Sequence, residues 1–339
     1  MAMLFIDSFD FYTSAEMGKK YVQNVGGAIG ATSGRRGGGG FSSGIVGVLL
    51  PTNSGIVTMG AACYAGCWLC FANESQIQLG IIGNGNGGLT IWRTQTGYGN
   101  WSSSWTVNGA GYVIGTTRNG IIAAGNWYYI EVEAKLHGST GHVIIHVNGV
   151  NEPTTPDCSS AVNTLQGGTT NILYVGLQVR ADDFYVLDSS GSINNTFLGD
   201  VRVDAHFPMT PAGAHSEWTR STGADQWATV DETAPNITDY NSTPTLNAID
   251  TLTLENLKNS GGTIAAVQTL LYNSKSDAGP CVIAPVLRSG GTDYAGSGVA
   301  PSTDSWNYSR TVYDQNPSGP AAWDETAFNA LEVGYKKTA

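Results

Sequence analysis

Four aspartates in the stretch "DDFYVLDSSGSINNTFLGDVRV", residues 182–203, have types and a spacing that could do chemistry. Carboxylate oxygens are ligands for Ca²⁺, and a carboxylate pair can act as general acid and base. Aspartates at strand ends and turns also accept backbone N–H bonds, and Gly191 and Asn194 suit a turn. We favour the turn interpretation and expect no cofactor, with Ca²⁺ as the alternative. The candidate calcium ligands are Asp182, Asp183, Asp188 and Asp200.

A second acidic pattern is "WYYIEVEAKL", in which Glu131 and Glu133 stand two residues apart. Paired carboxylates cleave glycosidic bonds, and some concanavalin-like sandwiches carry them on one strand. The third acid of that pattern is missing, and Lys135 follows. We therefore expect solvent-facing charges, no catalytic residue and no enzyme. His142 and His146 would share a strand face, but no third metal ligand accompanies them.

Two strings match loop motifs in the wrong context. Gly83, Gly85 and Gly88 fit the G-x-G-x-x-G pattern of dinucleotide-binding loops, which lead from a strand into a helix. Here "LTIWR" follows, which predicts a second strand and a hairpin. Ser42 in "GFSSG" fits the nucleophile elbow of serine hydrolases, which also precedes a helix. The sequence after it, "IVGVLLP", is of β type, so we predict no hydrolase.

Three cysteines, Cys63, Cys67 and Cys70, have a spacing that can hold an iron–sulfur cluster. Their surroundings, "CYAGCWLCF", are apolar and strand-like, and alternate strand positions point to opposite faces. We therefore predict buried thiols rather than a metal site.

Five aromatic residues gather in "IWRTQTGYGNWSSSWTVNGAGY" with Asn, Gln and Ser beside them. Such rings can pack in the core, anchor a protein interface or stack on sugar rings. The candidates for glycan or protein contact are Trp92, Tyr98, Trp101, Trp105 and Tyr112.

The elements that must position these residues are short strands. In "WYYIEVEAKL", apolar and polar residues alternate with a period of two, and "HVIIHV" and an Asn-Gly turn follow. Strands are also predicted at 45–50, 55–59, 65–72, 76–82, 89–93, 172–180, 182–187 and 199–204. No strand–helix alternation appears, so we predict an all-β fold. The expected form is an antiparallel, concanavalin A-like jelly-roll sandwich with very little helix.

The sequence has few helix signals, and its composition indicates one domain boundary. Thr13 and Glu16 stand in capping-box register before a short helix, and Asp324 is a candidate N-cap. Residues 206–250 are rich in Pro, Thr and Asn. We therefore predict a sandwich over 1–205 and a smaller β-domain over 206–339, with 206–250 as its lead-in.

Composition limits the partners. The chain has 339 residues, 45 glycines, 13% charged residues and a net charge of −11. An acidic chain is a poor match for nucleic acid. Arg35 and Arg36 in "GRRGGGG" are expected at a solvated loop tip. The N-terminus lacks a secretory pattern and no apolar run reaches bilayer length, so we expect no membrane partner.

Several segments together resemble a family of tailed-bacteriophage virion structural proteins with a concanavalin A/laminin-G-like domain. They include "LFIDSFDFY", "WYYIEVEAKLHGSTGHVIIHVNGV", "ADDFYVLDSSGSINNTFLGDVRVDAHFP" and "WNYSRTVYDQNPSGPAAWDETAFNALEVGYK". The resemblance covers nearly the whole chain and is weakest across 28–125.

The resemblance implies a virion component with no catalytic residues to transfer. It implies other virion proteins as partners and assembly in the host cytoplasm. Some laminin-G-like domains bind Ca²⁺, which keeps that alternative open. A capsid-decoration or head-fibre role and a tail or baseplate role both remain open. We expect a homo-oligomer, with a trimer favoured at capsid threefolds. The alternative function is a tail-tip lectin module that recognises host glycan.

Overall fold

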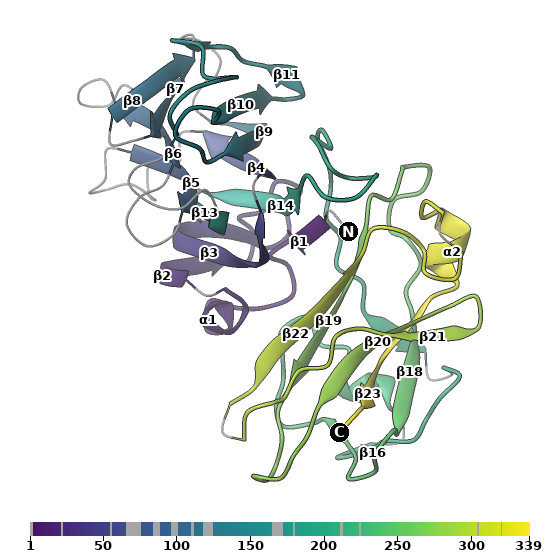
Figure 1. The fold of residues 1–339 in the computed structure, drawn as a ribbon. Helices are drawn as coiled ribbons and strands as arrows, with labels where there is room; N and C mark the ends of the chain where they lie inside the picture. The colour runs from purple at the N-terminus through teal and green to yellow at the C-terminus, as the bar shows by residue number, and fades with distance from the viewer. Residues whose placement is uncertain are drawn as a thin grey trace. The chain divides into compact units, whose positions relative to one another are not determined.

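The computed structural model describes residues 3–339 except 22, 55, 66–75, 84–88, 96–100, 110–111, 118–124, 165–171, 179, 211–212, 224, 304 and 320. The chain forms two compact units, Met1–Val203 and Asp204–Ala339. The predicted domains were 1–205 and 206–339. Figure 1 colours the first unit purple to teal and the second teal to yellow.

The first unit contains one short helix, α1 (Met17–Lys20), among its described residues, and is otherwise built of strands. The strands are β1 (Met3–Asp7), β2 (Gln23–Gly30), β3 (Gly40–Ser54), β4 (Ile56–Ala65), β5 (Gln76–Gly83), β6 (Leu89–Gln95), β7 (Trp101–Gly109), β8 (Tyr112–Thr117), β9 (Asn126–Lys135), β10 (His142–Val147), β11 (Val150–Asn151), β12 (Thr154–Thr155), β13 (Ile172–Gln178) and β14 (Ala181–Asp188).

These strands pair in two antiparallel runs, β1-β14-β4-β9-β10-β11 and β2-β3-β13-β5-β6-β7-β8-β12. Among the described residues, the runs join where Ala181 of β14 pairs with Phe41 of β3. Strand β14 is buried along its whole length, as expected of a strand with both faces covered. The predicted all-β antiparallel sandwich is confirmed.

A buried ion pair ties the start of the chain to α1. Asp7 on β1 accepts hydrogen bonds from the backbone N of Phe9 at 2.9 Å and from the Tyr12 hydroxyl at 2.6 Å. The Lys20 ammonium lies 2.8 Å from the same carboxylate, and both side chains are nearly inaccessible. Lys20 also lies over the ring of Phe11, 4.0 Å from its centroid. The buried carboxylate of Asp7 therefore holds the segment "IDSFDFY" in place through its contacts with Phe9 and Tyr12.

The second unit contains α2 (Glu325–Asn329), the 3₁₀ turn η2 (Trp227–Thr229) and short strands. These are β15 (Pro208–Thr210), β16 (Thr219–Arg220), β17 (Asn241–Ser242), β18 (Ile249–Leu254), β19 (Val267–Asn273), β20 (Ile283–Ser289), β21 (Thr292–Ala295), β22 (Asn307–Tyr313) and β23 (Glu332–Lys337). One sheet has the order β15-β18-β23-β20-β21, while β19 pairs with β22 and β16 with β17. Figure 1 shows β19 and β22 as a long ribbon.

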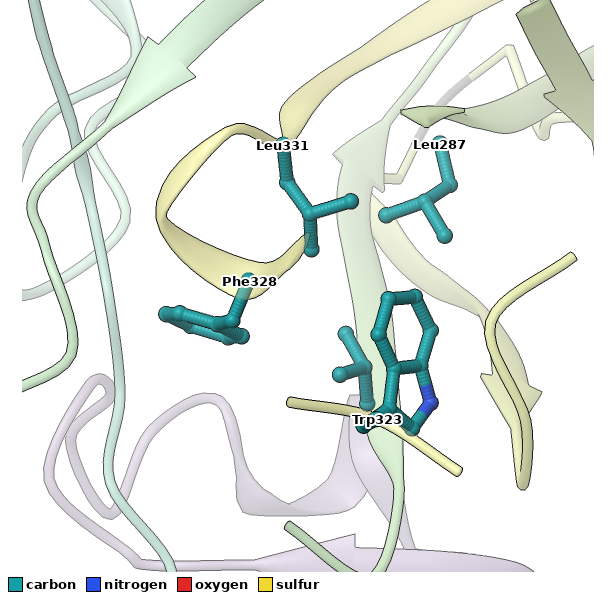
Figure 2. Packing of buried hydrophobic residues seen from close by; sticks show 5 residues of the cluster. Leu287, Trp323, Phe328 and Leu331 are labelled. Atoms are coloured by element: carbon teal, nitrogen blue, oxygen red, sulfur yellow. The ribbon is translucent and has the colours of Figure 1, made fainter. Parts of the chain in front are cut away.

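The core of this unit lies between that ribbon and the sheet. Val267 of β19, Leu287 of β20 and three residues of the C-terminal segment, Trp323, Phe328 and Leu331, form one buried cluster (Figure 2). Asp324 caps α2 as predicted, because its carboxylate accepts the Ala327 N–H at 2.7 Å.

The strand prediction at 199–204 is wrong, because this segment is not in a strand. The predicted first helix is confirmed but short. The Glu16 carboxylate accepts a hydrogen bond from the backbone N of Thr13 at 3.0 Å, one half of the expected capping box.

Candidate functional site

The segment after β14 lies on the outer face of β9 and β10 instead of forming a strand. Phe197 stacks on His146 of β10, with ring centroids 3.8 Å apart. The backbone N–H groups of Leu198 and Gly199 both donate to Oε1 of Glu131 on β9, at 2.9 and 2.8 Å. His146 and Glu131 are paired across the two strands. The segment therefore covers the face of β9 and β10 that carries Glu131 and His146, which strand periodicity alone predicts to be exposed to solvent.

Glu131 is consequently fully buried, and the prediction that it faces solvent is wrong. Its Oε1 also accepts the Tyr185 hydroxyl at 2.5 Å. Burial raises the pKa of Tyr185, and the neighbouring carboxylate adds to the shift, so the phenol stays a donor. Glu133 keeps 17% of its side chain exposed and pairs with His142, Oε1 to Nε2 at 3.1 Å. Of the two acids, Glu131 holds a loop in place and Glu133 forms a partly exposed pair with a histidine of the next strand.

Gly60 makes the bond between Tyr185 and Glu131 possible. It lies on β4 between the two strands, paired with Tyr185 on one side and Glu131 on the other. A Cβ at Gly60 would lie 2.2 Å from Cε1 of Tyr185. We expect Gly60→Ala to displace the tyrosine ring and lower the free energy of unfolding by about 1–3 kcal/mol in urea titrations. Gly18→Ala is the control, because only Asn24 lies near its Cβ, at 3.8 Å, and it should be close to neutral.

Two arginines hold the aspartates of the 182–203 segment. Arg36 Nη1 lies 2.7 Å from Oδ2 of Asp183, while the Arg35 guanidinium makes a bidentate pair with Asp200. The backbone N of Arg35 donates to Asp182 at 2.7 Å. Arg36 is exposed, as expected of a loop tip, but both arginines also make charge-assisted bonds to aspartates, which fasten the loop before β3 to β14.

Backbone N–H groups donate further hydrogen bonds to these aspartates. Asp183 Oδ1 accepts from Val203 at 2.8 Å, and Asp188 Oδ1 accepts from Ser190 at 2.9 Å. Asp183 itself has a φ of 52°, a left-handed conformation that aspartate tolerates better than most residues. These contacts are those of strand ends and turns. Asp188 belongs to its own turn rather than to the arginine cluster.

Among the described residues, no group of three or more His, Cys, Asp or Glu is placed to hold a metal ion. The calcium hypothesis for these four aspartates stays a prediction. Because guanidinium and N–H groups already contact the carboxylates, we expect the same melting temperature in millimolar CaCl₂ as in EDTA. A calcium-dependent rise that Asp200→Asn removes would contradict this expectation.

Burial raises the pKa of Asp182 to about 7, and the negative charge of Asp183 adds to this shift. An acid whose pKa is raised by folding favours the protonated native state. Stability is therefore lost as pH rises from the unfolded pKa near 3.8 towards 7.

Asp182→Asn should remove this pH dependence. We expect its stability relative to the parent to increase between pH 4 and pH 8 by about 1–3 kcal/mol, since one pKa unit corresponds to about 1.4 kcal/mol. Urea midpoints measured across that range test it. A parent-to-variant difference that stays constant with pH would contradict it.

Other sequence candidates lie apart from this cluster. Ser42 stands within strand β3, where its hydroxyl donates to the carbonyl of Ala28 at 3.0 Å. Strands β5 and β6 on either side of the glycine motif pair antiparallel, as the hairpin prediction requires, while Gly85 and Gly88 lie outside the described residues. Cys63 is a buried free thiol, and burial raises its pKa to about 12. Cys67, Cys70 and Tyr98 lie outside the described residues.

For four of the aromatic candidates only the backbone is described. Trp92 is in β6, Trp101 and Trp105 in β7, and Tyr112 in β8. Strand β7 pairs with both β6 and β8. The side chains of these four residues lie outside the described part of the structure, and their role as contact residues stays a prediction.

Asp250 in the second unit is a buried acid that the sequence reasoning missed. Oδ1 accepts the backbone N–H of Glu217 and Trp218 at 2.5 and 2.8 Å, and Oδ2 accepts Nε2 of Gln226 at 3.0 Å. Burial raises its pKa. Tyr335, its cross-strand partner, also donates to Oδ2 at 3.4 Å. The acid fastens residues 217–226 to β18, much as Glu131 fastens residues 198–199 to β9.

A row of aromatic rings on the second unit was also missed. Tyr308 and Tyr272 pair across β22 and β19 with ring centroids 4.8 Å apart. Tyr272 stacks on Trp306 at 5.6 Å, and Trp306 lies 6.2 Å from Tyr240. We call these four residues the ring ladder. The two-residue spacing of "WNY" was the available signal, because it puts two rings on one strand face.

No helix within the described residues is long and apolar enough to span a bilayer.

No protein-family model and no curated protein matches the chain. Among solved structures, it is similar to CG-16, a homodimeric agglutinin from chicken liver, at 13% identity and a TM-score of 0.25. That similarity covers 42% of this chain and 95% of the agglutinin. Domain 4 of AbnA, an extracellular arabinanase from Geobacillus stearothermophilus solved with arabinotriose, matches at 15% identity and a TM-score of 0.30. This second similarity covers 55% of this chain and 93% of the arabinanase domain. Similarities of this size assign no function to the chain.

Proposed function

We propose that the chain is a non-enzymatic structural protein on the exterior of a tailed-phage particle, as capsid decoration or head fibre, or as a tail or baseplate component. The proposal begins from the resemblance that runs through nearly the whole sequence. The observation that carries it is the structural role of the 182–203 segment, whose polar groups are taken up by contacts within the unit. Its acids contact arginines and backbone N–H groups, and its backbone covers Glu131.

Two further features support a structural role. Asp7, Glu131 and Asp250 are each buried, and each binds donors from another segment of its own unit. Such contacts stiffen surface segments, which suits a protein that endures outside a cell. The net charge of −11 fits an outer location away from packaged DNA. The partners would then be other virion proteins, with assembly in the host cytoplasm and a homo-oligomer as the unit.

Purified particles test the proposal. Density-gradient particles from an infected culture should contain the chain in a constant ratio to the major capsid protein, as measured by quantitative mass spectrometry. Lysines of the chain should react with a membrane-impermeant biotin reagent on intact particles. The proposal fails if the chain stays in the lysate, or if it reacts only after the particles are broken.

The second candidate is recognition of host glycan by the aromatic stretch 92–112, whose described residues lie on the consecutive antiparallel strands β6, β7 and β8. A glycan array comparing the parent with Trp101→Ala and Trp105→Ala tests it. Binding by the parent that both variants lose supports this site. No binding by the folded parent removes it.

A further inference from the structure

We propose that Lys20 and Asp7 of the first unit condense into an intramolecular amide, an isopeptide bond between their side chains. The bond ties α1 to β1, which in turn pairs with β14. The proposal does not depend on the virion assignment, because it rests on the contacts of two buried groups of the chain itself.

The two reacting groups lie in contact and out of water. Nζ of Lys20 is 2.8 Å from Oδ1 of Asp7, and the two side chains expose 1% and 0% of their surface. Groups that are held together in this way react as if they were present at an effective concentration of about 10⁵–10⁸ M. Proximity therefore favours the formation of an amide between this amine and this carboxyl group.

The surroundings of the pair are aromatic. Nζ of Lys20 lies 4.0 Å from the ring centroid of Phe11, 4.6 Å from that of Tyr12 and 5.6 Å from that of Phe5. Two buried charges carry a desolvation cost that a neutral amide does not, and attraction between the ammonium and the rings offsets only part of it. A desolvated lysine amine is also an active nucleophile. The pocket therefore favours the neutral amine and its amide product.

The two oxygens of Asp7 have different partners. Oδ2 accepts the hydroxyl groups of Tyr12, at 2.6 Å, and of Tyr21. Oδ1 faces Lys20 and accepts the backbone N–H of Phe9 at 2.9 Å. Burial raises the pKa of Tyr12, and the charge of Asp7 adds to the shift, so this phenol remains a donor. Oδ2 therefore lies in an oxyanion hole made of two phenols, while Oδ1 is the oxygen that leaves.

These positions give a balanced reaction. Oδ1 of Asp7 takes one proton from the Lys20 ammonium, which leaves a neutral amine and a neutral acid. The amine lone pair attacks Cγ of Asp7 and forms a C–N bond, while the two phenols stabilise the negative charge that develops on Oδ2. A second proton passes from the nitrogen to Oδ1, the bond between Cγ and Oδ1 breaks, and one water leaves. Nothing is oxidised or reduced.

Mass spectrometry of the intact, full-length chain under denaturing conditions tests the proposal. We expect the parent to be lighter than its sequence by one water, and Asp7→Ala and Lys20→Arg to have their full sequence masses. Lys19→Arg is the matched control, because Lys19 is exposed and directly precedes Lys20. This control should lose the water as the parent does.

Tryptic digestion locates the bond. Trypsin does not cleave after an acylated lysine, so Lys20 should stay at the start of a peptide that ends at Arg35. Fragmentation should show this peptide attached through Lys20 to Asp7 of the peptide that ends at Lys19.

The rate of bond formation tests the two phenols. Chains are sampled at intervals after cell-free translation, quenched in acid and weighed by the same method. We expect Tyr12→Phe and Tyr21→Phe each to slow the loss of water about a hundredfold, since removal of one oxyanion-hole donor costs about 10²–10³ in rate. Circular dichroism confirms that each variant is folded.

The proposal is overturned if the folded parent has its full sequence mass, a result that holds whether or not any variant folds. It is equally overturned if Lys20→Arg also lacks the water, which would indicate a cyclic imide at an aspartate. A branch attached to a residue other than Asp7 or Lys20 overturns it too. Equal rates in the parent and both tyrosine variants would overturn the role assigned to the phenols.

Discussion

Glu131→Ala should lower the free energy of unfolding by about 3–5 kcal/mol, the range found when one partner of a buried charged contact is removed. The substitution removes the acceptor of the Tyr185 hydroxyl and of the Gly199 N–H, while the Leu198 N–H keeps a longer bond to the Tyr185 oxygen at 3.3 Å. Each buried donor without a partner costs about 1–3 kcal/mol. Urea titration of the parent and the variant gives the difference, and hydrogen exchange at residues 197–200 should accelerate.

Glu133→Ala is the matched control because it lies two residues along the same strand. Its side chain is partly exposed, at 17%, and its carboxylate pairs with a histidine, a contact worth about 1 kcal/mol or less. Glu131→Gln is a milder second variant, since an amide oxygen still accepts the three bonds. If both Glu131→Ala and Glu133→Ala lower the free energy of unfolding equally, Glu131 does not hold residues 198–199 against β9.

Asp250→Ala should cost the second unit a similar amount, about 3–4 kcal/mol. The N–H groups of Glu217 and Trp218 and the Gln226 amide lose their acceptor together. The segment they belong to would separate from β18. Hydrogen exchange of the peptide spanning 214–222 should report this separation directly, with urea unfolding giving the free energy.

Asp277→Ala serves as the control for that experiment. Asp277 is exposed on the same unit, where it accepts the N–H of Gly279 at 2.7 Å, outside the 214–222 peptide. Its removal should cost about 0.5 kcal/mol or less. If the 214–222 peptide keeps its protection in Asp250→Ala, the acid does not hold that segment.

The strands could be predicted because their residues alternate. Burial of Ile130, Val132 and Ala134 on β9 follows from a period of two alone. The same reasoning failed for Glu131, since its cover comes from residues 197–199, more than sixty positions later in the chain. A local pattern does not reveal which loop will cross which strand.

The acids of the 182–203 segment were predicted as turn and strand-end residues, and Asp183 and Asp188 do accept backbone N–H bonds. Their arginine partners could not be predicted, because Arg35 and Arg36 lie about 150 positions earlier in a glycine-rich loop. Asp250 was missed for a related reason. An acid inside the alternating run "IDTLTL" looks solvent-facing until residues 217–226 are seen to cover it.

Gold-labelled antibodies raised against the folded chain and applied to intact particles test the central claim most directly. We predict that electron micrographs show gold on the particle surface. Hundreds of labels over the head would indicate capsid decoration, and about a dozen or fewer at one end would indicate a tail component. Intact particles that carry no more gold than an unrelated phage, with the chain recovered only from the soluble lysate, would contradict the account.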